Sequence, residues 1–375
     1  MKKPVCVRVA GVGPVLVLTL VFLGASGVSA QAPAPAPHKK SASAVKAAPT
    51  PATPAIILRG DHSSARVFND LVKQYEAGKH GKITVQPFNT ISGLDAVNAG
   101  TADIAGSARP AMMERDEEKT TTFYPVAWDA LVPITSTKNP VSNITLKQLH
   151  DLYLGRLTDW KDLGGEPAEI NLYGVAGPLD GIEYSTRVLL FHHGDQAVSV
   201  PRLYVNTEKL EEGIAIDPHG IGMSTLSGVG RNPAIKMLAV EGITASSSSI
   251  ADGSYPLYSP LYLAARDDGK NQEASLKFIR YSESDSAKAI LRKRDLVPYA
   301  DAPSLVEKHD AHIAWVDRHV RPTATADGTP VSAPNATAQA LQRIAPTSEQ
   351  AVQAKERAAR AAAEKKNSKP DAGGH

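Results

Sequence analysis

A serine and an arginine lie two residues apart in a segment whose composition suits anion binding. Residues 101–110 read Thr-Ala-Asp-Ile-Ala-Gly-Ser-Ala-Arg-Pro. We predict a short strand ending near Ile104 and a loop carrying Ser107 and Arg109, because Pro110 stops a strand and suits the first turn of a helix. A hydroxyl, backbone N–H groups and a guanidinium at such a junction are donors for an oxyanion. A solvated turn with a surface arginine is the alternative that this short segment leaves open.

Two similar units precede this segment and are expected to position it. Each consists of a predicted strand, a polar loop and a predicted helix: 56–60, 61–64 and 67–75 in the first unit, and 82–87, 89–93 and 94–98 in the second. Ser63 or Ser64 is the expected N-cap of the first helix. The repeated order predicts a parallel sheet whose loops meet at the carboxyl ends of its strands, where open α/β sheets bind ligands.

Two long apolar runs follow, Val126–Thr135 and Tyr255–Ala264, and both are candidates for strands that cross between lobes. Hydrophobic periodicity predicts further strands at 169–175, 220–223 and 234–240. It also predicts helices at 146–153, 184–191, 274–279, 287–291 and 305–316. Thr145 is the expected cap of the helix that starts at Leu146. Residues 322–345 are rich in Pro, Thr, Ala and Asn. We therefore expect residues 301–345 to be an irregular extension apart from the helix at 305–316.

The two ends of the chain differ in composition from the part between them. Residues 1–30 resemble a secretory signal, with early basic residues, an apolar core and a small-residue cleavage site after Ala30. We therefore expect a periplasmic or secreted protein, with an uncleaved anchor as the alternative. Residues 31–55 form a Pro/Ala-rich linker, and residues 346–375 an Ala-rich charged tail that is weakly docked or disordered.

Composition disfavours several classes of function. A net charge of +2 and 5% aromatic residues argue against a nucleic-acid partner. Cys6 is the single cysteine, so an intrachain disulfide is impossible. No Gly-x-Ser-x-Gly elbow is present, and His309 and His312 are more simply read as solvated than as metal ligands. We therefore expect no enzyme activity, no metal and no cofactor.

Several motifs resemble the phosphate-binding proteins, the periplasmic substrate-binding proteins of bacterial phosphate ABC transporters. The similarity covers roughly residues 55–300. The motifs are Asn139–Thr145 with Leu149 and Leu152–Trp160, then Asp103–Pro110, Asp252–Leu257 with Leu261–Leu263, and Val297–Pro298. The resemblance implies a two-lobed α/β fold of the type II periplasmic binding proteins, with the lobes joined by two crossover strands. Lobe one would combine 56–127 with 258–300, and lobe two would be 128–257.

The same resemblance implies a function and its partners. The protein would act as a monomer that holds phosphate or a related small oxyanion in a cleft between the lobes and delivers it to a membrane permease of the ABC type. An alternative is a binding-protein fold whose degenerate site serves a structural or adhesive role in the cell envelope. The Pro/Ala-rich linker and a departure from the family in the fourth loop favour that alternative.

The family binds its ligand with hydroxyls, helix N-termini and an arginine. The resemblance implies that Ser64, Thr90 with Ser92, Ser107 and Arg109 contribute these groups from three loops of lobe one. The fourth loop departs from the family, which has an arginine on the strand followed by Ser-Gly-Thr. Here the sequence has Val175 on the strand and then Asp180-Gly181-Ile182. We expect Asp180 and Gly181 to face the other site residues from lobe two.

A carboxylate at this position bears on which ligand the site accepts. Within about 4–6 Å of a phosphate dianion it opposes binding, unless it accepts a proton from the ligand or pairs with a cation. Asp180 could therefore accept a ligand proton, repel phosphate, or mark a degenerate site. The sequence leaves all three open.

Overall fold

The computed structural model describes residues 55–112, 115–177, 179–229 and 232–320. The predicted signal sequence, the charged tail and all but the last residue of the predicted linker lie outside these ranges. Within them, no helix is both long and apolar enough to cross a membrane.

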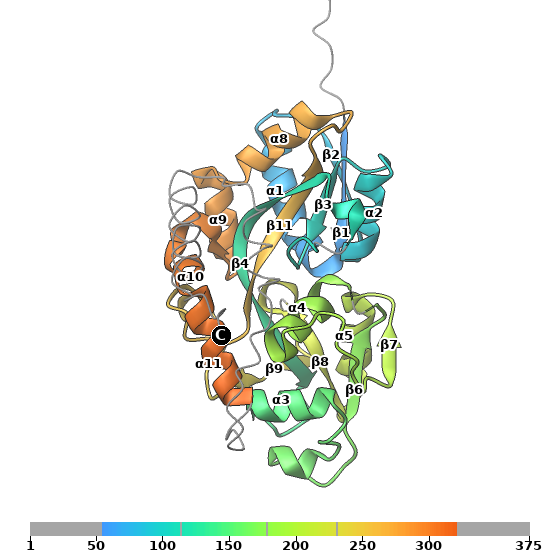
Figure 1. Ribbon diagram of the computed structural model, residues 1–375, viewed down its shortest axis with the longest axis vertical. Helices are drawn as coiled ribbons and strands as arrows, with labels where there is room; N and C mark the ends of the chain where they lie inside the picture. The colour runs from blue at the N-terminus through green and yellow to red at the C-terminus, as the bar shows by residue number, and fades with distance from the viewer. Residues whose placement is uncertain (1–54, 113–114, 178, 230–231, 321–375) are drawn as a thin grey trace, which may run out of the picture. The chain divides into compact units, whose positions relative to one another are not determined.

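Strands and helices alternate along most of the described chain (Figure 1). The strands are β1 Ile56–Asp61, β2 Ile83–Phe88, β3 Ile104–Ser107, β4 Thr121–Ser136, β5 Asn143–Ile144, β6 Asn171–Val175, β7 Arg202–Tyr204, β8 Gly220–Thr225, β9 Ile235–Met237, β10 Ala239–Val240, β11 Tyr258–Arg266 and β12 Val297–Pro298. The helices are α1 His62–Ala77, α2 Thr90–Asn98, α3 Leu146–Tyr153, α4 Gly181–Phe191, α5 Thr207–Ile216, α6 Leu226–Val229, α7 Ser247–Ala251, α8 Gln272–Tyr281, α9 Asp285–Lys293, α10 Pro303–Glu307 and α11 His309–Val320.

The long strand β4 connects two halves of the structure. The strand order is β2-β1-β3-β11-β4-β8-β6-β7, and β1 is parallel to both β2 and β3, as the repeated units predicted. The first part of β4 pairs with β11, and its last part pairs with β8 and β9. Hydrogen-bonded strands therefore continue from one half into the other, because β4 pairs with strands of both halves. We call β1–β3 and β11 with α1, α2, α8 and α9 the first lobe, and β6–β9 with α3–α7 the second (Figure 1).

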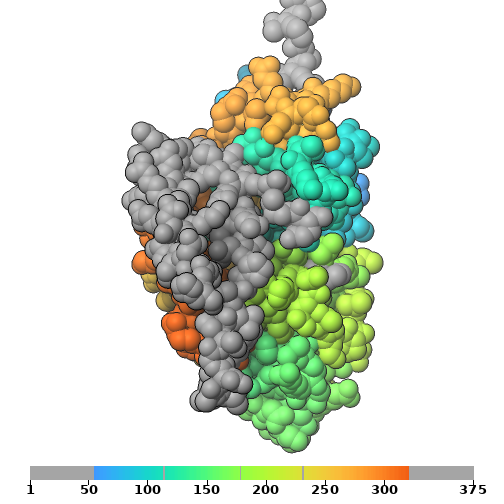
Figure 2. Space-filling model, in the orientation of Figure 1, coloured from blue at the N-terminus to red at the C-terminus, as the bar shows by residue number. Residues whose placement is uncertain are grey.

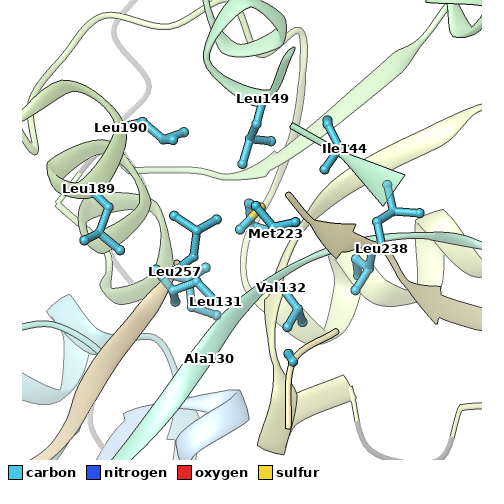
Figure 3. Close-up of a cluster of buried hydrophobic side chains, with 14 of the residues drawn as sticks. Ala130, Leu131, Val132, Ile144, Leu149, Leu189, Leu190, Met223, Leu238 and Leu257 are labelled. Atoms are coloured by element: carbon cyan, nitrogen blue, oxygen red, sulfur yellow. The ribbon is translucent and has the colours of Figure 1, made fainter. Parts of the chain in front are cut away.

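Each lobe has its own buried hydrophobic core. In the first, Phe68 and Leu71 of α1 pack in one cluster with Leu58, Ile104 and Leu263 of three strands. In the second, the end of β4 is surrounded by side chains from several helices and strands (Figure 3). The labelled members of this cluster are Ala130, Leu131, Val132, Ile144, Leu149, Leu189, Leu190, Met223, Leu238 and Leu257. Burial of this apolar surface is the main force that stabilises both lobes.

Three predictions about local structure are wrong. Helix α2 begins at Thr90 rather than Leu94, because the Asn89 side chain accepts the Ser92 N–H at 2.8 Å and caps the helix earlier. Asp61, not Ser63 or Ser64, caps α1. Strand β3 begins at Ile104 and includes Ser107, which was predicted in a loop, because this strand pairs with β11 as far as Ser107. The helix predicted at 305–316 is present as α10 and α11, whose apolar residues Leu305, Val316 and Val320 join the core of the second lobe.

Candidate functional site

The start of α2 contacts the start of α4 at a buried point between the two lobes. Thr90, the first residue of α2, is fully buried, and its N–H donates to Asp180 Oδ1 at 2.8 Å. Asp180 is the residue that precedes α4 in the second lobe. The Ala108 N–H, just after β3, donates to Thr90 Oγ1 at 3.4 Å. Three chain segments from the two lobes therefore meet at Thr90.

Gly181 is required for this close approach. A Cβ atom at this position would lie 2.9 Å from the Ala108 Cβ and closer still to Thr90 Oγ1. Neither neighbour is the far end of a flexible side chain, so both backbones would have to shift. Glycine thus allows the N-terminus of α4 to pack directly on the first lobe.

The Asp180 carboxyl group is buried, with 1% of the residue exposed. Burial raises its pKa to about 7, and the nearby Asp61 carboxylate contributes to this rise, while the N–H groups of Thr90, Gly181 and Ile91 oppose it. Within the described ranges, Asp180 Oδ2 has no hydrogen-bond partner. One carboxyl oxygen of Asp180 therefore accepts a hydrogen bond from the start of α2, and the other has no partner among the described residues.

Asp61 caps the neighbouring helix α1 in a similar way. Its Oδ1 accepts the N–H groups of Ser63 at 2.9 Å and Ser64 at 3.3 Å, and also the Ser63 hydroxyl. Burial raises the Asp61 pKa, while these hydrogen bonds lower it. Like Asp180, Asp61 has an Oδ2 atom without a partner among the described residues. The first N–H groups of α1 are thus already bound by a carboxylate.

The serine hydroxyls predicted to bind ligand each donate to a carbonyl oxygen two or three residues away in the sequence. Ser64 Oγ donates to the Asp61 carbonyl at 2.9 Å, Ser92 Oγ to that of Asn89 at 3.1 Å, and Ser107 Oγ to that of Arg109 at 2.7 Å. Ser64 and Ser107 are buried and Ser92 is half-buried. A ligand that used these hydroxyls as donors would have to replace these local hydrogen bonds.

Arg109 is not a surface arginine, and its guanidinium already has an anionic partner. It is fully buried, and its guanidinium donates to Glu118 through Nη1 at 2.9 Å and Nη2 at 2.6 Å. It also donates to the carbonyl oxygens of Pro110 at 2.8 Å and Leu179 at 2.8 Å. These bonds use four of the five N–H groups of the side chain. Glu118 is therefore the anion that Arg109 binds in this structure, and the predicted contact of Arg109 with a ligand stays a prediction.

A buried ion pair between Glu183 and Arg187 lies in α4, just after the fourth loop. The Val175 N–H donates to Glu183 Oε1 at 3.0 Å, and Glu183 Oε2 accepts from Arg187 at 3.3 Å. Arg187 also donates to the Gln196 carbonyl at 3.3 Å. Its charge is thus used within the second lobe rather than at Thr90.

Further hydrogen bonds join the lobes around this point. Ser185 Oγ donates to the Ala108 carbonyl at 2.9 Å, and Arg66 donates to Glu211 at 3.3 Å and to the Gly228 carbonyl. Figure 2 shows the cyan surface of the first lobe meeting the green surface of the second. The lobes are therefore in direct polar contact at more than one place.

Two functional groups of this region were not predicted, namely Glu118 and the capping carboxylate of Asp61. Asp61 could have been found, since an aspartate directly after a strand and before Ser-Ser is a common N-cap signal. Glu118 carries no such signal, because its pairing with Arg109 depends on the path of the chain between them. Within the described ranges, no group of three or more His, Cys, Asp or Glu residues could hold a metal ion.

Comparison with known proteins gives consistent relatives. A family model described as the PBP superfamily domain matches residues 45–286. The phosphate-binding protein PstS of Bacillus subtilis (strain 168) is 23% identical over 290 residues, which cover 76% of this chain and 94% of that protein. PstS of Borreliella burgdorferi is 22% identical over 250 residues, which cover 64% and 88% of the two chains.

Solved structures show the same fold. A Clostridium perfringens chain, assigned as a phosphate ABC transporter substrate-binding protein and solved with bound phosphate, matches with a TM-score of 0.60 at 21% identity and covers 65% of this chain and 99% of its own. An ABC-type phosphate transport receptor from Vibrio cholerae gives 0.51 at 24% identity and covers 64% and 99%. These matches confirm the predicted two-lobed α/β fold class.

Proposed function

The chain belongs to the PBP superfamily domain family, and we propose that it is an exported solute-binding protein of the phosphate ABC-transporter type. Its ligand is phosphate or a related small oxyanion, held between lobes that comprise 56–127 with 258–300 and 128–257. Relatives named as phosphate-binding proteins support this ligand class. The protein acts as a monomer, passes its ligand to a membrane permease and catalyses no reaction.

The observation that carries this proposal is the binding of a carboxyl oxygen at the start of α2. The Thr90 N–H donates to Asp180 Oδ1 at 2.8 Å, so this buried N–H group already binds the oxygen of an acidic side chain. Backbone N–H groups at a helix N-terminus, together with the helix dipole, favour negative charge. An oxyanion oxygen can use the same N–H group, with the Thr90 hydroxyl beside it.

Calorimetric titration of the purified protein with phosphate tests the proposal, with sulfate as the control anion. We expect phosphate to bind and Thr90→Val to weaken it by roughly tenfold, the effect of about 1.4 kcal/mol. Thr101→Val is the matched control, because the Thr101 hydroxyl donates to the Ala96 carbonyl at the far end of α2. Equal affinities of the two variants would contradict the assignment of the site.

A degenerate site with a structural or adhesive role is the second candidate. The specific observation in its favour is that Asp61 and Asp180 already bind the N–H groups that begin α1 and α2. In that case neither the wild type nor Asp180→Ala would bind phosphate in the same titration. Binding by the wild type favours the transport function, whereas binding by Asp180→Ala alone would show that Asp180 blocks the wild-type site.

A further inference from the structure

Asp180 is a residue of the second lobe that reaches the predicted anion-binding groups of the first. Its Oδ1 lies 2.8 Å from the Thr90 nitrogen, although the two residues are 90 positions apart in sequence. Its carboxyl oxygen therefore occupies the backbone N–H group at the start of α2 that an oxyanion would use.

We propose that Asp180 is an internal competitor for the oxyanion and that it also fastens the two lobes together. Its side-chain oxygen binds the N–H group at the start of α2, so a ligand must displace it to use that group. The same hydrogen bond joins the start of α4 to α2 between the lobes. Asp180 thereby lowers the affinity for oxyanions and, together with the contacts of Ser185 and Arg66, holds the lobes in contact.

Two neighbouring features support this role. Gly181 brings the backbone of α4 so close to Thr90 and Ala108 that the Asp180 side chain need not extend far to reach α2. The Arg109 guanidinium, the cation of the third loop, is bound to Glu118 and so does not neutralise Asp180. The side chain of Asp180 is left with backbone N–H groups as its polar partners, and with the Asp61 carboxylate as a nearby repulsive charge.

The fastening role is tested without any ligand. Spin labels at Lys73→Cys of α1 and Glu212→Cys of α5, both exposed, report the distance between the lobes by electron paramagnetic resonance. We expect a short distance in the otherwise wild-type protein and in Asp180→Asn, which keeps an acceptor oxygen of the same reach. Asp180→Ala removes that oxygen and should give a longer distance. An unchanged distance in Asp180→Ala would overturn the fastening role.

The competing role rests on the proposed function and has its own readout. We expect Asp180→Ala to bind phosphate about tenfold more tightly than Asp180→Asn, because the alanine leaves the Thr90 N–H free. Equal or weaker binding by Asp180→Ala would overturn the competition. If no variant binds phosphate, the proposed function fails, while the distance measurement still decides whether Asp180 fastens the lobes.

Discussion

Replacing Arg109 with alanine should destabilise the protein rather than only weaken ligand binding. The side chain is fully buried and makes a two-bond contact with Glu118, together with hydrogen bonds to the carbonyls of Pro110 and Leu179. Removing one partner of a buried ion pair costs roughly 3–5 kcal/mol, because the other charge remains buried without compensation.

The structure places the expected cost at the lower end of that range. After the loss of Arg109, Glu118 keeps the Met112 N–H at 2.8 Å, and the Arg115 Nε lies 3.2 Å from its Oε1. These contacts compensate part of the charge. We therefore expect Arg109→Ala to lower the free energy of unfolding by about 3 kcal/mol.

Urea denaturation measures this change directly. Arg294→Ala is the matched control, because Arg294 pairs with Asp70 on the surface, where both side chains are about one-third exposed. Such a pair contributes at most about 1 kcal/mol, so the control should be nearly neutral. A cost for Arg109→Ala as small as that of the control would refute the argument that Arg109 is structural.

Three further perturbations test the region between the lobes. Gly181→Ala should lower the melting temperature, at a cost of roughly 1–3 kcal/mol for overpacking, whereas Gly269→Ala, where a Cβ meets nothing closer than 3.5 Å, should not. Burial raises the pKa of Asp129 to about 6, so the folded state binds this proton more tightly than the unfolded state. In urea denaturation the wild type should therefore lose about 2.4 kcal/mol of unfolding free energy relative to Asp129→Asn as the pH rises from 4 to 7, and parallel curves would exclude this. Burial and the Asp61 carboxylate raise the pKa of Asp180 to about 7. Ionisation of Asp180 above that pH disfavours its buried position and should favour separation of the lobes. The spin-label distance should therefore increase between pH 6 and pH 8 in the wild type and stay constant in Asp180→Asn.

The fold could be predicted from the sequence because its signals are local. The strand–loop–helix repeat predicted the parallel sheet of β1, β2 and β3, and the two apolar runs identified β4 and β11. The boundaries were less predictable, since caps decide them. Asn89 starts α2 four residues before the predicted Leu94, and Asp61 competes successfully with the serines that follow it.

The site was only partly predictable, because partner choice depends on three-dimensional proximity. The structure brings Thr90, Asp180 and Gly181 together from the two lobes. It turns the Arg109 side chain toward Glu118, and nothing in the sequence marks Glu118 as its partner. A motif can therefore indicate which residues form a loop, but not which of its side chains remain available to a ligand.

The central claim is that an oxyanion binds at the N-terminus of α2. Backbone amide chemical shifts during titration with phosphate, with sulfate as the control, test it most directly. The account predicts that the largest shifts fall on Thr90 and Ala108, and that they are larger in Asp180→Ala than in wild type. Phosphate-dependent shifts confined to other parts of the chain, or none in either protein, would contradict it.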